Sequence, residues 1–140
     1  MLRIETIQNR AQLRDFVRFP LRIYSGDSPW VPPVWREEMM RLDRARGPFF
    51  EHSEAALFLA RDAAGDPVGR IAAIRFNRHL EVYGDGVGFF GFFECVEDES
   101  VAGRLFATAA EWLRGQGLKR MRGPTSFTIN EEIGLLIENF

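Results

Sequence analysis

Apolar residues gather along the chain in short runs that predict β-strands. Residues 54–62 and 68–76 are two such runs, although the Ala and Leu content of 54–62 would also suit a helix. The short turn 63–67 between them predicts an antiparallel hairpin. Residues 87–96 are the most apolar stretch and are expected to form a central strand. The shorter predicted strands are 2–7 and 119–123.

Apolar positions at helical spacing predict three helices. The first follows Asn9, a suitable N-cap, and is expected to end at Pro20. The second is expected to begin at Pro33, because proline suits the first turn of a helix. The third, 98–114, is the best defined, and we expect Asp98 to cap it. Its apolar stripe consists of Val101, Leu105, Ala109, Trp112 and Leu113.

The predicted order is a strand, two helices, three strands, a helix and a final strand. Such an order builds an α/β (α+β) mixed sheet with helices packed on its faces. The polar residues 77–86 and the turn-rich residues 124–130 are expected to be loops. With 140 residues and no recognisable linker or repeat, the chain is predicted to be a single domain, 1–140.

The central strand carries four phenylalanines and two glycines. Side chains alternate across a strand, so Phe90 and Phe92 are expected on one face and Phe89 and Phe93 on the other. Glycine lowers strand propensity, so the two glycines indicate a bulge or a close approach by another group.

Composition and charge exclude several classes of function. The net charge of −2 provides no basic footprint for nucleic acid or for a membrane surface, so neither is expected as a partner. No apolar run reaches the ~20 residues of a membrane span, and residues 1–6 lack a signal-peptide pattern, so a cytoplasmic location is expected. The single cysteine excludes an internal disulfide framework and a multi-Cys metal site, and two histidines are too few for a His-rich site. No metal is expected, and a mixed site that includes carboxylates is the alternative.

Distinctive segments follow one another along the chain: 29–33 (PWVPP), 47–52 (GPFFEH), 67–74 (PVGRIAAI), 88–94 (GFFGFFE) and 122–124 (RGP), with Asn130 after them. Together with the order of elements, they resemble the GNAT superfamily, and most closely bacterial GNAT-like proteins of unassigned activity. The resemblance implies a GNAT-like acyl-CoA N-acyltransferase fold. Those relatives are longer, so the chain is expected to lack the C-terminal helix and strands of a GNAT domain. An unpaired sheet edge would favour a homodimer.

The resemblance also implies where acyl-CoA (acetyl-CoA or another acyl-CoA) is bound. In a GNAT domain the fourth strand splays from its neighbour and leaves backbone groups for the pantetheine arm. The next helix directs its N-terminus at the pyrophosphate, where free amides and the helix dipole favour an anion. The implied cofactor-binding residues are Cys95, Val96, Glu97, Ser100, Val101, Ala102 and Gly103.

Three carboxylates at this junction keep a second hypothesis open. The GNAT loop has the form Arg/Gln-x-x-Gly-x-Gly/Ala, and this chain places Glu97, Ser100 and Ala102 at those positions, of which only Ala102 fits. Glu97, Asp98 and Glu99 suit a helix start but repel a pyrophosphate. The alternatives are a GNAT-fold binding or oligomerisation module that no longer binds CoA, or a truncated product without activity of its own.

Five residues are candidates for chemistry and substrate binding. Glu94 ends the aromatic strand and is the candidate catalytic residue, a general base for an amine; the alternative is a carboxylate paired with an arginine. Trp30, Arg122 and Asn130 are the candidate substrate-binding residues, and Arg122 can hold a carboxylate or phosphate bidentately. Cys95 is either an acyl-accepting thiol or a small buried hydrophobe. The predicted reaction is direct transfer of an acyl group from acyl-CoA to an unknown amine.

Overall fold

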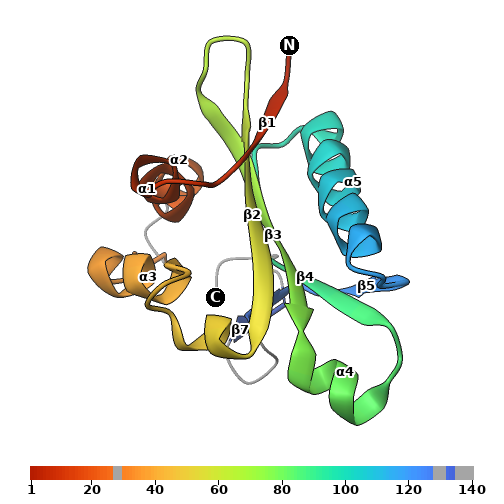
Figure 1. Ribbon diagram of the computed structural model, residues 1–140. Helices are drawn as coiled ribbons and strands as arrows, with labels where there is room; N and C mark the ends of the chain where they lie inside the picture. The colour runs from red at the N-terminus through yellow and green to blue at the C-terminus, as the bar shows by residue number, and fades with distance from the viewer. Residues whose placement is uncertain (27–29, 128–131, 135–140) are drawn as a thin grey trace.

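The computed structural model describes residues 1–26, 30–127 and 132–134, and a five-stranded sheet lies at its centre (Figure 1). The strands are β1 (Arg3–Thr6), β2 (Ser53–Arg61), β3 (Pro67–Phe76), β4 (Val87–Cys95), β5 (Arg120–Arg122), β6 (Thr125–Ser126) and β7 (Glu132–Ile133). The large sheet has the order β1-β2-β3-β4-β5, antiparallel except for the parallel pair β4–β5. A second sheet pairs β6 with β7.

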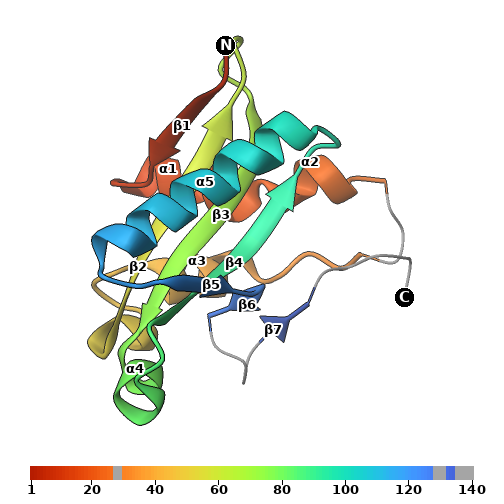
Figure 2. The ribbon, with the colours of Figure 1, turned by 90° about the vertical axis from the view of Figure 1, so that its right-hand side faces the viewer.

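Helices cover both faces of the large sheet (Figures 1 and 2). They are α1 (Arg10–Arg18), α2 (Pro20–Tyr24), α3 (Trp35–Leu42), α4 (Asn77–Tyr83), α5 (Glu99–Gly115) and the 3-10 helix η1 (Pro48–Glu51). The N-terminal helices α1, α2 and α3 lie on one face, and α5 lies on the other. The chain therefore forms three layers, with the sheet in the middle.

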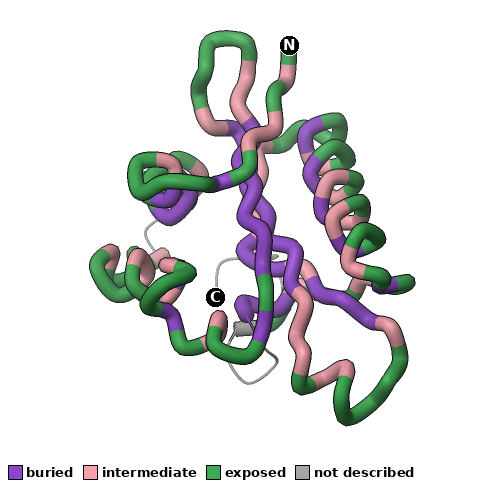
Figure 3. Tube along the Cα trace, viewed as in Figure 1, coloured by how far each residue is buried: buried purple, intermediate pink, exposed green. Residues whose placement is uncertain are grey.

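Two apolar cores result from this layering, one on each face of the sheet. The first lies beneath α1 and α3 and includes the fully buried Phe16, Leu59 and Phe127. The second lies beneath α5 and includes Ile71 and Leu105. Figure 3 shows the consequence, a continuous buried path along the central strands. Burial of both faces explains why β2, β3 and β4 are apolar almost throughout.

The hairpin and the long helix confirm the predictions made from the sequence pattern. β2 and β3 pair antiparallel along their length, with one irregularity at Ala60 and Arg61. Asp98 caps α5, because its carboxylate accepts a hydrogen bond from the Ser100 amide at 2.9 Å. Gly117 follows the helix at φ 79°, a left-handed conformation that glycine adopts without a steric penalty.

Two local predictions are wrong, and one helix was not expected. The expected loop 77–86 contains α4, whose Leu80 packs against the core beneath α5 and whose end is Gly84 at φ 57°. The first helix, α1, ends before Pro20 as predicted, but Pro20 then opens α2, because proline at the first helical position loses no hydrogen bond. The expected loop 124–130 contains β6. These elements are short and depend on tertiary contacts, which the apolar pattern does not record.

A bulge in β4 reverses the alternation of its side chains. The register with β3 shifts after Arg70, and Phe92 adopts φ 53°, which is unusual for a bulky residue. Phe89 and Phe92 therefore join the core beneath α1 and α3, whereas Phe90 and Phe93 pack against the other core. The predicted facing of the phenylalanines is wrong, while the predicted bulge is confirmed.

Gly91 lies at this bulge and is packed against the backbone of β6. A Cβ atom at position 91 would overlap the carbonyl group of Thr125. Two hydrogen bonds hold the same segment: the Phe92 amide donates to Ser126 Oγ at 3.0 Å, and the Arg41 guanidinium donates to the Ser126 carbonyl. The close approach predicted from the glycines is confirmed, and only glycine allows it here.

We expect Gly91→Ala to destabilise the protein by about 1–3 kcal/mol or more, the usual cost of overpacking, because the added methyl group would meet rigid backbone rather than a movable side chain. The matched control is Gly103→Ala in α5, where nothing lies within 4 Å of an added Cβ. This control should stabilise the protein by up to ~1 kcal/mol through helix propensity. Urea denaturation measures both, and equal effects of the two substitutions would contradict the close approach.

Candidate functional site

The candidate site lies where β4 separates from β5. The two strands pair only over Val87–Phe89 and Arg120–Arg122. Figure 2 shows β4 continuing away from β5 towards α2. Within the described residues, the end of β4 beyond the bulge has β3 as its only strand partner. This is the stretch of β4 at which the resemblance places the pantetheine arm.

Glu94 and Trp30 are brought together by a residue that the sequence did not reveal, Tyr24. The Tyr24 hydroxyl donates a hydrogen bond of 2.7 Å to Glu94 Oε2. The Tyr24 ring stacks on Trp30, with centroids 5.3 Å apart and an interplanar angle of 23°. Tyr24 is the last residue of α2, and 70 positions separate it from Glu94, so no local pattern connects them.

Burial raises the pKa of the Glu94 carboxyl above its ordinary value. The hydrogen bond from Tyr24 and the positive charge of Arg70, which lies opposite Glu94 in the β3–β4 register, both act against this increase. The Glu94 carboxyl accepts its side-chain hydrogen bond from the neutral Tyr24 hydroxyl, and Glu94 forms no ion pair with another of the described residues. A carboxyl with a raised pKa is suited to accept a proton near neutral pH.

Arg70 is a buried cation beneath this site, with only 8% of its surface exposed. Its guanidinium donates to the Phe16 carbonyl at 2.9 Å and lies 5.0 Å and 5.8 Å from the ring centroids of Phe16 and Phe92. Arg70 thus connects the end of α1 with the bulged part of β4. It positions the layer that carries Tyr24 relative to the strand that carries Glu94.

The N-terminus of α5 is already occupied by its own cap. Asp98 Oδ1 accepts hydrogen bonds from the Ser100 amide at 2.9 Å and the Ser100 hydroxyl at 2.6 Å, and these bonds lower the pKa of Asp98. Glu97 and Glu99 are exposed beside it. The start of α5 therefore presents carboxylates rather than free amides.

Some of the predicted cofactor-binding residues lie at the surface around the start of α5, and others are buried or half-buried. Glu97, Ser100 and Gly103 are exposed, and Cys95, Val96 and Ala102 are half-buried. Val101 is buried in the core beneath α5 and faces away from the surface.

Cys95 lies in an environment that keeps its thiol protonated. Burial and the negative charge of Asp98 both raise the pKa of Cys95, and its Sγ lies 4.0 Å from the Asp98 carbonyl oxygen. A thiol is nucleophilic as the thiolate. This environment disfavours Cys95 as a nucleophile.

The structure does not bring Arg122 to Glu94. Arg122 is exposed on β5 opposite Phe89, and Glu94 lies five residues further along β4, roughly 15 Å at the rise of a strand. Asn130 lies outside the described residues.

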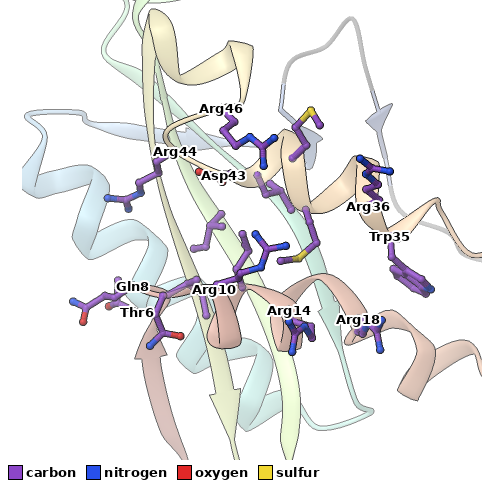
Figure 4. Close-up of a pocket in the computed structure, with 17 residues that line it drawn as sticks. Thr6, Gln8, Arg10, Arg14, Arg18, Trp35, Arg36, Asp43, Arg44 and Arg46 are labelled. Atoms are coloured by element: carbon purple, nitrogen blue, oxygen red, sulfur yellow. The ribbon is translucent and has the colours of Figure 1, made fainter.

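A cavity of about 920 Å³ lies apart from Glu94, between α1 and α3 (Figure 4). A smaller cavity of about 280 Å³ lies beside α4 and includes His52 and Arg78. Within the described residues, no group of three His, Cys, Asp or Glu side chains is arranged to hold a metal ion. In the same part of the chain, no helix has the length and apolar character to cross a membrane.

Two curated proteins are similar to almost the whole chain. "Protein YghO" of Escherichia coli (strain K12) is 38% identical over 137 residues, which cover 98% of this chain and 35% of that protein. A protein named bacterial ceramide synthase, from Caulobacter vibrioides (strain NA1000 / CB15N), is 36% identical over 140 residues, 99% of this chain and 36% of that protein. The chain thus spans about a third of the length of these relatives. No protein-family model matches it.

Solved structures share the architecture at low sequence identity. AAC(6')-Iy, in complex with the bisubstrate analogue CoA-S-monomethyl-acetylneamine, superposes with a TM-score of 0.61 at 17% identity, over 99% of this chain and 98% of that chain. A GNAT-family acetyltransferase from Staphylococcus aureus Mu50 superposes with a TM-score of 0.60 at 14% identity, over 89% and 73% of the two chains.

The raised pKa of Glu94 predicts a specific pH dependence of stability. The folded state holds the Glu94 proton to higher pH than the unfolded chain does, so the stabilising contribution of this group is complete below the unfolded pKa and is lost as the pH rises through the folded one. The free energy of unfolding of the wild type minus that of Glu94→Gln should therefore fall as the pH rises from ~4 to ~8. Urea denaturation across this range measures it.

Tyr24→Phe is the companion variant for this measurement. Tyr24→Phe removes a hydrogen bond that opposes the rise in the pKa of Glu94. The difference in free energy of unfolding between Tyr24→Phe and the double variant Tyr24→Phe/Glu94→Gln should therefore fall more steeply with pH than the difference between wild type and Glu94→Gln. If the difference in free energy of unfolding between the wild type and Glu94→Gln stays constant or rises with pH, burial does not raise the pKa of the Glu94 carboxyl.

Proposed function

Because the chain has the fold of the GNAT acetyltransferases, we propose that it is an N-acyltransferase that joins the acyl group of an acyl-CoA to the primary amine of a long-chain amino alcohol. The observation that carries the proposal is the Tyr24–Glu94 pair at the separated end of β4. It combines a proton acceptor, a proton donor and an open strand edge in one place.

Acyl-CoA would supply the activated acyl group, and the residues of the chain would handle the protons. An amine is protonated near neutral pH, so Glu94 would take a proton from it, directly or through one water molecule. The amine nitrogen then forms the new bond to the acyl carbon, the carbon–sulfur bond breaks, and the sulfur leaves. Tyr24 holds a hydroxyl proton beside Glu94 and would donate it to the leaving sulfur. As the amide forms, the nitrogen would return its second proton to the Tyr24 oxygen, and Glu94 would release its proton to solvent.

The described residues fit part of an acyl-CoA molecule better than the rest. The unpaired edge of β4 suits the amide groups of a pantetheine arm. The carboxylates of Glu97, Asp98 and Glu99 oppose a pyrophosphate at the start of α5, where Asp98 also uses the free Ser100 amide. Acyl-CoA binding through the strand, weakened by these carboxylates where the pyrophosphate approaches the helix start, is consistent with both observations.

The class of amine is inferred from a relative and from the exposed apolar residues of the acceptor side. Ceramide is the amide of a fatty acid and a long-chain amino alcohol, and one relative is named bacterial ceramide synthase. The segment that carries Tyr24 and Trp30 also exposes apolar side chains, at 38% for Leu21, 80% for Val31 and 61% for Val34. Exposed apolar residues suit an aliphatic acceptor better than a polar one.

We expect Glu94→Gln to lower kcat/KM at least ~100-fold, the usual contribution of a general base. Tyr24→Phe should also lower kcat/KM at least ~100-fold, because it removes the proposed proton donor to the leaving sulfur. The assay measures free thiol released from a long-chain acyl-CoA in the presence of sphinganine, with ethanolamine as the polar comparison. Glu111→Gln, on the exposed surface of α5, makes the same chemical change and should leave the rate unchanged.

Thiol release that is unaffected by Glu94→Gln would remove Glu94 from the reaction. No amine-dependent thiol release with either acceptor would overturn the acyltransferase proposal and leave a GNAT-fold binding module.

We expect Glu97→Gln to tighten CoA binding by about three-fold, because one exposed repulsive charge is removed from the start of α5. Isothermal titration calorimetry with CoA measures the affinity, and the stabilisation of the fold by CoA provides a second readout. The control is again Glu111→Gln. Equal affinities of the Glu97→Gln variant and the wild type would show that the pyrophosphate does not approach this helix end.

A further inference from the structure

The cavity between α1 and α3 has an apolar floor. Ile7, Leu13, Leu42 and Leu57 line it and are buried, and Met39 of α3 lies beside them. Its volume of about 920 Å³ is in the range of sites for small organic molecules, ~300–1,000 Å³. Methionine side chains are flexible and adapt to an alkyl chain. The floor is therefore suited to an aliphatic ligand.

The rim of the same cavity is strongly cationic. Six arginines line it: Arg10, Arg14 and Arg18 along one side of α1, and Arg36, Arg44 and Arg46 from α3 and the residues after it (Figure 4). Asp43 is the one acid among the lining residues, so the lining carries a formal charge of +5. The rest of the chain, with 12 cations and 19 acids, carries −7. The net charge of −2 conceals this concentration.

The protein neutralises little of this charge itself. Arg44 donates to the Ala55 carbonyl at 3.0 Å, and Arg18 lies 6.0 Å from the Trp35 ring centroid. Among the described residues, no ion pair involves any of the six arginines of the rim. By contrast, Arg61 outside the groove pairs with two carboxylates, at 2.9 Å and 2.8 Å.

The charges of α1 also oppose its own helix. Arg10, Arg14 and Arg18 are spaced four residues apart, so they are like-charged neighbours on one face. Arg10 opens the helix, no acid occupies the first turn, and the helix dipole disfavours a cation at that end. In α3 the first turn carries Glu37 and Glu38, as the dipole favours. An anion in the groove would relieve the repulsion along α1.

We propose that this groove binds a single-chain anionic amphiphile, an alkyl chain that carries a phosphate or carboxylate. The chain lies on the apolar floor, and the anionic head lies among the guanidinium groups, which bind phosphate and carboxylate bidentately. A concave site between two helices suits one inserted chain rather than a flat surface. The groove repels an ammonium group, so it is distinct from the amine site at Glu94, and the proposal does not depend on the proposed acyltransferase activity.

Calorimetry with dodecyl phosphate below its micelle concentration tests the proposal on the 140-residue protein. We expect dodecyl phosphate to bind at least ten-fold more tightly than butyl phosphate or inorganic phosphate. Dodecyltrimethylammonium, with the same chain and the opposite charge, should not bind. Dodecanoate in place of dodecyl phosphate distinguishes a carboxylate head from a phosphate head, and tight binding of either one supports the proposal.

A pair of double variants locates the site. Arg10→Gln with Arg14→Gln should weaken dodecyl phosphate at least ten-fold, since both guanidinium groups lie on the rim. The matched control is Arg104→Gln with Arg114→Gln, which removes two exposed arginines from α5 on the opposite face. Thermal melts establish that both variants fold, and Glu94→Gln should bind dodecyl phosphate as the wild type does.

Four results would overturn the proposal. Equal affinity for inorganic phosphate and dodecyl phosphate would leave an anion site without a chain site. Equal weakening by the two double variants would reflect net charge alone. No binding of monomeric dodecyl phosphate or dodecanoate would exclude the ligand class. Arginine-dependent binding to phosphatidylglycerol vesicles without binding of the monomeric amphiphiles would assign the groove to a membrane surface.

Discussion

The close contact between Gly91 and the Thr125 carbonyl is the constraint on which the site depends. It holds β6 against the bulge of β4, where β6 pairs with β7 and not with β4. The contact is supported from the first core, where the Phe127 ring stacks on Phe49 at 4.2 Å and meets Phe92 at 5.0 Å. One glycine thereby sets both the reversed alternation of the aromatic strand and the open edge beside Glu94.

A buried charge connects this strand to the helices above it. Arg70 comes from β3, bonds the last turn of α1 through the Phe16 carbonyl, and lowers the pKa of Glu94 by its charge. A buried guanidinium is costly unless its hydrogen bonds are satisfied. Arg70 is therefore better understood as a positioning residue than as a source of stability. It relates α2, which follows α1 directly and carries Tyr24, to the strand that carries Glu94.

The sequence predicted the elements whose signal is local and missed those that depend on distant contacts. The β2–β3 hairpin and α5 follow from the spacing of apolar residues, the helix cap and the turn residues, which all lie within short stretches of the sequence. The alternation of the phenylalanines was mispredicted because the bulge adds one residue, and its glycines indicate a bulge without giving its exact position. Glu94 and Trp30 were identified separately, but Tyr24, which joins them, carries no local signal. The arginines of the groove were hidden by a net charge near zero, because the rest of the chain carries a formal charge of −7.

The two faces of the sheet carry opposite local charges. The arginines around the groove lie on the face of α1 and α3, and the carboxylates at the start of α5 lie on the other face of the sheet. Screening limits exposed charges to about 8–10 Å at physiological ionic strength, so each field acts near its own face. An anionic amphiphile is therefore attracted to one face and repelled at the other. Substitutions on the two faces share no partner, and their effects should add.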